Sequence, residues 1–197
     1  MVALTFDDGP DPARTPRILD LLGERGIRAT FFVFGVKARR NRELIARALE
    51  AGHEVQPHCW ADHDSHLKLT EAEIEVEIER TVKTLTHLGC PPPTLWRPPY
   101  GHIREPETHA VAATHGLEVV TWTLDTLDWD PDGRALSLDE VDAQLEPDSV
   151  VLMHDPIPRT AELLAGLLDR VEARGLEAGP MAVRASSHSS IEGSVLA

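Results

Sequence analysis

Short apolar segments alternate along the chain with longer segments in which apolar residues recur every three or four positions. The short segments predict β-strands and the longer ones α-helices, because these spacings match the periods of the two structures. Strands are expected at residues 2–6, 29–34, 54–55, 95–96, 117–123 and 150–153, and helices at about 15–25, 39–51, 70–88, 105–115 and 160–174. Repeated strand–helix units predict an α/β fold with a parallel sheet or a barrel.

Two local signals support this interpretation. The segment 29–34 is apolar at nearly every position, as in a parallel strand that is buried on both faces. Thr70 and Glu73 have the spacing of a capping box, which marks the beginning of a helix.

The chain of 197 residues fits one domain, which at this size buries roughly 70% of the surface of the unfolded chain. We expect this domain to cover residues 1–184. Residues 185–197 are mostly small and polar, a composition that predicts a disordered tail.

Charge and hydropathy exclude several classes of partner. The formal net charge is −14, from 33 acidic and 19 basic residues, which disfavours binding to nucleic acid. No apolar run approaches the ~20 residues of a membrane helix. Met1 leads directly into the first strand, so we expect a cytoplasmic protein, or a secreted one if an export segment has been trimmed. Cys59 and Cys90 form no paired pattern and predict no disulfide framework.

Two adjacent carboxylates, Asp7 and Asp8, follow the first predicted strand and precede Gly9-Pro10. A turn that caps the next helix would explain this sequence on its own. The other interpretation is a functional site, because side chains at the carboxyl ends of parallel strands gather at one edge of an α/β fold. One acid could there bind a metal ion while the other accepts a proton.

The loop 57–69 follows the third predicted strand and carries His58, Asp62 and His63. Imidazole and carboxylate groups suit a zinc-class ion, and three protein ligands with an open position are typical of a catalytic metal site. His58 and Asp62 are four residues apart and would share a helical face, whereas His63 needs a looser loop. A histidine-rich surface loop is the alternative interpretation.

Three more segments place candidate residues near strand ends: Arg97-Pro-Pro-Tyr100, Asp125-Thr-Leu-Asp128-Trp129 and His154. In the first segment the two prolines restrict the backbone and leave the N–H of Tyr100 as a fixed donor. Each segment also has a structural interpretation, respectively a rigid connection, an Asp-rich turn and a structural histidine.

The four tryptophans lie in or next to these segments. Trp60 and Trp129 are on predicted loops, so we expect them to line a pocket. Trp96 and Trp122 lie within predicted strands and are equally well explained by the core.

Together these five motifs, in this order, resemble those of the polysaccharide deacetylases, the chitooligosaccharide-deacetylase-like members of carbohydrate esterase family four. The motifs are Thr5-Phe-Asp-Asp-Gly-Pro10, the His58 loop, Arg97-Pro-Pro-Tyr100, Asp125-Thr-Leu-Asp-Trp129 and Val151-Leu-Met-His154. The resemblance covers about residues 2–183 and implies a catalytic domain with the fold of a distorted (β/α) barrel of six to seven parallel strands.

The resemblance also implies roles for individual residues. Asp7 would be the general base, with Arg97 holding its carboxylate in place. His154 would be the general acid, with Asp128 orienting and tuning it. Tyr100 would donate its backbone N–H to the oxyanion of the reaction, and Trp129 would form a wall of the substrate groove.

For the metal, the resemblance implies a divalent ion, foremost zinc, with cobalt or nickel as alternatives. Asp8 and His58 would be its first two ligands. The family pattern has two histidines four residues apart with a hydroxyl residue after the first, but here Cys59 takes the hydroxyl position and Asp62 the fourth place. One residue is therefore inserted, and counting back from the following helix aligns His63 with the second histidine, which makes His63 the preferred third ligand over Asp62.

The implied reaction is metal-dependent removal of N-acetyl groups from N-acetylglucosamine-containing saccharides. One alternative keeps the mechanism and changes the substrate to a small cytoplasmic amide or imide. Another alternative is a saccharide-binding module without activity, but Asp7 and His154 argue against it because binding alone needs no acid–base pair.

Overall fold

The computed structural model describes residues 1–61 and 68–181. Its main sheet has the strand order β3-β2-β1-β7-β6, with β8 paired to the beginning of β1, and a second sheet consists of β4 and β5. Every strand pair in both sheets is parallel. The strands are β1 (Val2–Gly9), β2 (Thr30–Val33), β3 (Glu54–Pro57), β4 (Leu95–Trp96), β5 (Glu118–Val119), β6 (Leu124–Asp125), β7 (Val150–His154) and β8 (Ala178–Gly179).

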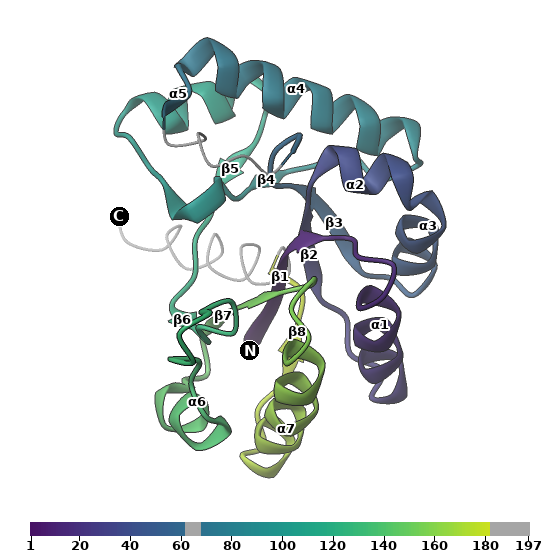
Figure 1. The fold of residues 1–197 in the computed structure, drawn as a ribbon, viewed down its shortest axis with the longest axis vertical. Helices are drawn as coiled ribbons and strands as arrows, with labels where there is room; N and C mark the ends of the chain where they lie inside the picture. Colours follow the sequence, from purple (N-terminus) through teal and green to yellow (C-terminus); the bar gives the residue numbers. More distant parts are fainter. Residues whose placement is uncertain (62–67, 182–197) are drawn as a thin grey trace, which may run out of the picture.

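Within the described ranges, seven α-helices surround these strands. Figure 1 shows α4 and α5 above the strands, α6 and α7 below them, and α1, α2 and α3 on the right-hand side. The helices are α1 (Thr15–Glu24), α2 (Gly35–Arg40), α3 (Arg42–Glu50), α4 (Glu71–His87), α5 (Glu107–Thr114), α6 (Leu138–Gln144) and α7 (Thr160–Ala173), with a 3₁₀ turn at Pro99–Gly101.

The α/β class and the distorted (β/α) barrel are confirmed. The described residues form eight strands rather than six to seven, because four of them (β4, β5, β6 and β8) contain only two residues each. The barrel is irregular between β3 and β4, because these two strands form no hydrogen-bonded ladder. The buried side chain of Gln56 joins them instead, its Oε1 accepting from the backbone N–H groups of Thr94 and Leu95 at 3.1 Å each.

Two predicted elements differ from the structure. The helix expected at 39–51 is two helices, which meet at Asn41, where the backbone leaves the helical region (φ −118°, ψ 47°). The strand expected at 117–123 is shorter, because only Glu118–Val119 (β5) is a strand there, and β6 begins after its predicted end, at Leu124. The capping box of Thr70 and Glu73 is confirmed at the beginning of α4.

The core lies between the sheet and the helices. Phe6 of β1 stacks on Phe31 of β2 with ring centroids 5.0 Å apart, within a cluster that α1, α3 and α7 cover. Within the described residues no helix combines the length and the apolar character needed to span a membrane. Cys59 and Cys90 are both buried, and no disulfide joins them. The tail predicted at 185–197 lies outside the described residues.

Candidate active site

The end of β1 turns both carboxylates of the Asp7-Asp8 pair toward one pocket. In a regular strand, neighbouring side chains point to opposite faces. Here Asp8 has a positive φ of 69°, and the pairing with β2 shifts register between Asp7 and Gly9. As a result both residues line a cavity of about 430 Å³, together with His58 and His154.

Asp7 is held by a buried arginine from the end of β4. Arg97 Nη1 donates to Asp7 Oδ1 at 2.8 Å, and both side chains are almost fully buried. The same Nη1 donates to Thr5 Oγ1 at 2.8 Å, while Nη2 donates to the carbonyl of Thr121 at 2.8 Å. The Thr5 hydroxyl gives its own proton to the carbonyl of Val151 at 2.6 Å, which leaves its lone pairs for Arg97. A cation anchored at this many points fixes the Asp7 carboxylate firmly.

His58 follows β3 and presents one defined nitrogen to Asp8. Its Nδ1 lies 2.6 Å from the carbonyl oxygen of Arg97. Because a carbonyl can only accept, Nδ1 carries the proton and Nε2 has a free lone pair in the neutral ring. Nε2 lies 3.3 Å from Asp8 Oδ1 and 4.0 Å from Asp7 Oδ2.

These two donor atoms fit a metal ion. Two ligands bound to tetrahedral zinc at roughly 2.0–2.1 Å lie about 3.3 Å apart, which matches the Nε2–Oδ1 separation. A backbone carbonyl that holds the second ring nitrogen is also the usual way in which proteins orient a metal-binding histidine. His58 and Asp8 could therefore provide two ligands to a metal ion.

The charges around His58 favour a cation at this point. Burial lowers the pKa of His58, but the carboxylates of Asp7 and Asp8 raise it more, so the net shift is upward. Burial raises the pKa of Asp8, but its hydrogen bond and charge interaction with His58 outweigh that effect and lower it. The expected third ligand, His63, and its rival Asp62 both lie outside the described residues. Among the described residues no group of three His, Cys, Asp or Glu side chains could hold a metal ion.

His154 ends β7 directly beside Asp7, its register partner on β1. Its Nδ1 lies 2.7 Å from Asp128 Oδ1, and its backbone N–H donates to Asp128 Oδ2 at 2.8 Å. The hydroxyl of Thr160 at the beginning of α7 lies 2.5 Å from the same Oδ2. Burial lowers the pKa of His154, but the hydrogen bond and charge of Asp128 raise it more, and the net shift is upward. The imidazole is therefore held in its protonated form to a higher pH than usual, as a general acid requires.

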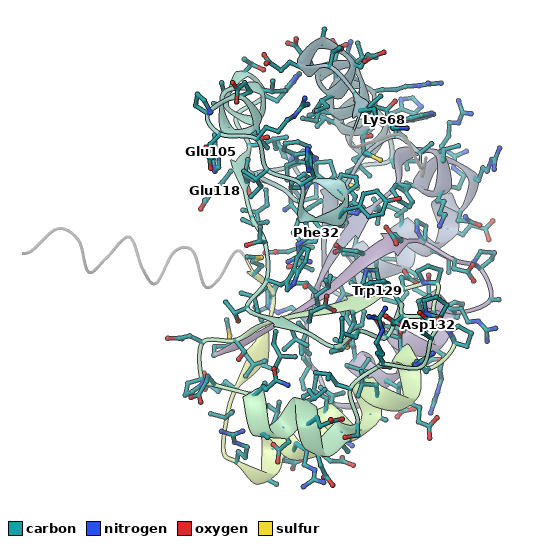
Figure 2. All side chains as sticks on the ribbon, turned by 60° about the vertical axis from the view of Figure 1, so that its left-hand side comes forward. Phe32, Lys68, Glu105, Glu118, Trp129 and Asp132 are labelled. Carbon is teal, nitrogen blue, oxygen red and sulfur yellow. The ribbon has the colours of Figure 1, made fainter. Side chains whose placement is uncertain are left out.

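Aromatic residues form the walls of the cavity. Tyr100, Trp122 and Trp129 all line it, and the side chains of Tyr100 and Trp129 remain largely exposed. Figure 2 shows Trp129 on the loop between β6 and α6, on the same side of the molecule as Asp132. The indole N–H of Trp129 lies 3.4 Å from Asp125 Oδ2, which supports the ring from below the loop.

The tryptophan expectations are confirmed only in part. Trp129 lines the cavity and Trp96 is buried in the core, where its indole N–H donates to the carbonyl of His58 at 2.6 Å. Trp122 lines the cavity rather than filling the core. Trp60 is buried against Gly35 and does not line this cavity, but a separate hollow on the outer surface. The reason is that α2 begins earlier than predicted and covers the indole.

Three supporting residues escaped the sequence analysis. Thr5 and Thr160 hold Arg97 and Asp128, respectively, but a threonine within a strand or at the beginning of a helix gives no signal of such a role. The third is Asp155, which is fully buried next to His154 and whose Oδ1 accepts from Thr15 Oγ1 at 2.6 Å. Burial raises the pKa of Asp155 to about 7. A Cβ at Gly9 would lie 2.1 Å from Asp155 Oδ2, so only glycine permits this close packing under the Asp7-Asp8 turn.

Comparisons with known proteins agree with the geometry. The sequence profile of the family described as polysaccharide deacetylase matches residues 1–120. The chain is 37% identical over 176 residues to the peptidoglycan-N-acetylglucosamine deacetylase PgdA of Listeria monocytogenes, covering 89% of this chain and 37% of PgdA. It therefore spans little more than a third of the length of that relative.

A shorter relative is covered more fully. The chain is 38% identical over 161 residues to a chitooligosaccharide deacetylase of Sinorhizobium fredii, covering 80% of this chain and 73% of that protein. Among solved structures, a mutant of the peptidoglycan deacetylase PdaC of Bacillus subtilis superimposes with a TM-score of 0.86 at 29% identity, over 98% of this chain and 93% of that one.

Proposed function

We propose that this chain, which belongs to the polysaccharide deacetylase family, removes N-acetyl groups from N-acetylglucosamine-containing saccharides by metal-dependent hydrolysis. The observation that carries the proposal is the pairing of a base and an acid on neighbouring strands. Asp7 is held by Arg97, and His154, whose pKa is raised, is held by Asp128. A binding module would need neither partner.

The metal in this proposal is a divalent ion, foremost zinc. Asp8 and His58 would hold it, with His63 as the preferred third ligand over Asp62. When bound, such an ion supplies a Lewis acid that makes water more acidic and the amide carbonyl more electrophilic. Cobalt and nickel are the alternatives, because imidazole and carboxylate ligands accept these ions too.

The chain's own residues would then divide the proton transfers. Asp7 accepts a proton from the attacking water as the new C–O bond forms, while Arg97 and Thr5 keep the carboxylate aimed at it. The backbone N–H of Tyr100 donates to the developing oxyanion, a contribution of roughly 3–4 kcal/mol for a well-placed donor. His154 Nε2 then gives its proton to the amine nitrogen as the C–N bond breaks, since Asp128 engages Nδ1.

Two features support a saccharide as the substrate. Tyr100 and Trp129 offer exposed aromatic faces at the mouth of the cavity, which suit the apolar faces of sugar rings. The relatives PgdA and the Sinorhizobium fredii enzyme are named for acting on peptidoglycan N-acetylglucosamine and on chitooligosaccharides.

Acetate release tests the proposal directly. The protein is treated with a chelator, reloaded with zinc, cobalt or nickel, and assayed on chitooligosaccharides and on a panel of small soluble N-acetylated amines and imides. We expect acetate from the saccharides only in the metal-loaded protein. Acetate released from the small amides alone would show that the substrate is a small amide and not a saccharide. Activity that survives full removal of metal would contradict the proposed metal dependence.

The ligands are tested separately by metal content. We expect His58→Ala and Asp8→Ala to lose bound metal, with His63→Ala losing more than Asp62→Ala. Circular dichroism of each variant shows whether it remains folded. If the His63→Ala variant retains as much metal as the wild-type protein, the third ligand position would be assigned to Asp62.

A further inference from the structure

A second hollow lies on the outer surface formed by α2, α3 and α4. Its volume is about 560 Å³, and it shares no lining residue with the catalytic cavity. The residues that line it are Arg39, Arg42, Trp60, Arg80, Lys83, Thr84, His87 and Leu88. We refer to it as the arginine pocket.

The arginine pocket is basic, although the chain as a whole is acidic. The whole sequence carries a net charge of −14, yet three arginines and a lysine line this hollow and none of its described lining residues is acidic. Lys83 pairs with Glu79 on the same helix, Nζ to Oε1 at 2.6 Å. With the described part of the chain, Arg39, Arg42 and Arg80 form no ion pair. In a protein with such an excess of acids, three arginines that line one hollow without an ion pair to the described residues need an explanation.

Trp60 orders two of these arginines. The guanidinium carbon of Arg80 lies 3.8 Å from the centroid of the indole ring, and that of Arg39 lies 5.3 Å away. Trp60 itself is fixed, because its backbone N–H donates to Glu77 Oε2 at 2.9 Å and its carbonyl accepts from Val36 N–H at 2.8 Å. A guanidinium stacked on an aromatic face keeps its N–H edge available for a planar or tetrahedral oxyanion. The ring therefore reduces the entropy that the arginines would lose on binding an anion.

We propose that the arginine pocket binds a ligand through a phosphate group. Phosphate carries a charge of about −1.5 to −2 at neutral pH and offers three or more acceptor oxygens, so it can use several cations at once. A carboxylate carries a single negative charge and is matched by one arginine. The convergence of Arg39, Arg42 and Arg80 therefore favours phosphate.

Isothermal titration of the metal-loaded protein with inorganic phosphate, at constant ionic strength, tests this assignment. We expect saturable binding that Arg39→Gln weakens about tenfold, the effect of losing one charge-assisted hydrogen bond. Arg40→Gln is the matched control, because Arg40 neighbours Arg39 on α2 and is exposed but does not line the pocket. It should change the affinity by less than about twofold, as expected for a distant surface charge.

Three outcomes would overturn the proposal. If Arg39→Gln and Arg40→Gln weaken phosphate binding equally, the binding would be due to the general positive charge of this surface and not to the pocket. Phosphate binding that neither variant changes would place the anion at the catalytic centre. Tighter binding of glucuronate than of phosphate would assign a carboxylate ligand. Arg42→Gln, on the opposite side of the α2–α3 junction, provides a second test should Arg39→Gln fail to fold.

Discussion

The side of the cavity that holds the proposed base and the side that holds the proposed acid are built in the same way with opposite charges. On the base side Asp7 is held by Arg97, which Thr5 holds in turn. On the acid side His154 is held by Asp128, which Thr160 holds in turn. Each reactive group thus has a partner of the opposite charge, and each partner is anchored by a threonine hydroxyl.

The two sides differ in how deeply they are buried. Arg97 has no exposed side-chain surface and Asp7 has 4%, whereas the side chain of His154 is 14% exposed. In the proposed mechanism Asp7 stays in place to accept a proton from water, while His154 must reach the leaving group of the substrate and later exchange its proton with solvent. The proposed acid therefore depends on the protonation state of His154, and the proposed base depends on the fixed position of the Asp7 carboxylate.

The largest expected effect is that of Asp7→Asn. The amide keeps the size of the side chain but cannot accept the proton of water, so we expect the hydrolysis rate to fall by about a hundred- to ten-thousandfold. The loss should be equally large for an N-acetylated saccharide and for a phenyl acetate ester, measured by acetate release. A loss confined to one substrate would show that Asp7 is not the base.

His154→Ala should separate the two substrates. A departing amine needs a proton and a phenolate does not, so we expect the N-acetyl substrate to lose about a hundred- to ten-thousandfold in rate while the ester loses far less. Parallel kinetics on both substrates measure the difference. An equal loss on the ester would mean that His154 acts at an earlier step.

Asp128→Asn should shift the pH profile of the reaction. His154 works as an acid only below its pKa, so activity declines as pH rises through that value. Asp128 raises this pKa, and without its charge the effect of burial remains, which lowers it. We therefore expect the alkaline limb of kcat/KM to move to lower pH, with a smaller loss of rate than in His154→Ala. Asp139→Asn, at an exposed position of α6, is the control and should leave the limb unchanged.

The smallest effects are expected from the two threonines. Thr160→Val removes one hydrogen bond to Asp128, and we expect a fall of about two- to tenfold in the rate on the N-acetyl substrate. Thr5→Val removes the side-chain donor to the carbonyl of Val151 and the acceptor of Arg97 Nη1, and we expect it to lower the free energy of unfolding by about 1–3 kcal/mol. Serine at either position should restore the lost quantity. If Thr160→Val instead destabilises the protein as much as Thr5→Val, Thr160 serves the stability of the fold rather than the orientation of Asp128.

Much of the fold could be predicted because its signals are local. The apolar segment 29–34 and the capping box at Thr70 depend on neighbouring residues, and both are confirmed. Helix α6 was not predicted, although Ser137 and Glu140 form a second capping box that marks its beginning. The packing of Gly35, at the beginning of α2, against the ring of Trp60 could not be foreseen, because the two residues lie far apart in the sequence.

In the candidate active site, too, residues within short motifs could be predicted, whereas contacts between distant residues could not. Short motifs pointed to Asp7, Arg97 and His154, and the structure brings all three to one cavity or its direct support. The hydroxyls that anchor them are invisible in the sequence, because Thr160 meets Asp128 across 32 residues and only the closed fold brings them together.

Among the residues that the structure describes, three that are not glycine lie near the cavity with positive φ: Asp8 (69°), Tyr100 (61°) and Leu127 (53°). Each such conformation costs of order 1–3 kcal/mol, which the surrounding structure must offset. The consequence concerns protein engineering. Glycine at these positions would relieve the backbone and offers an obvious route to a more heat-resistant variant, but it would also loosen the turns that aim Asp8, Tyr100 and the Asp128 loop. At Asp8, Tyr100 and Leu127 a gain in thermostability would therefore come at the expense of the geometry of the proposed active site. Mutant libraries that aim at higher thermostability should leave these three residues unchanged.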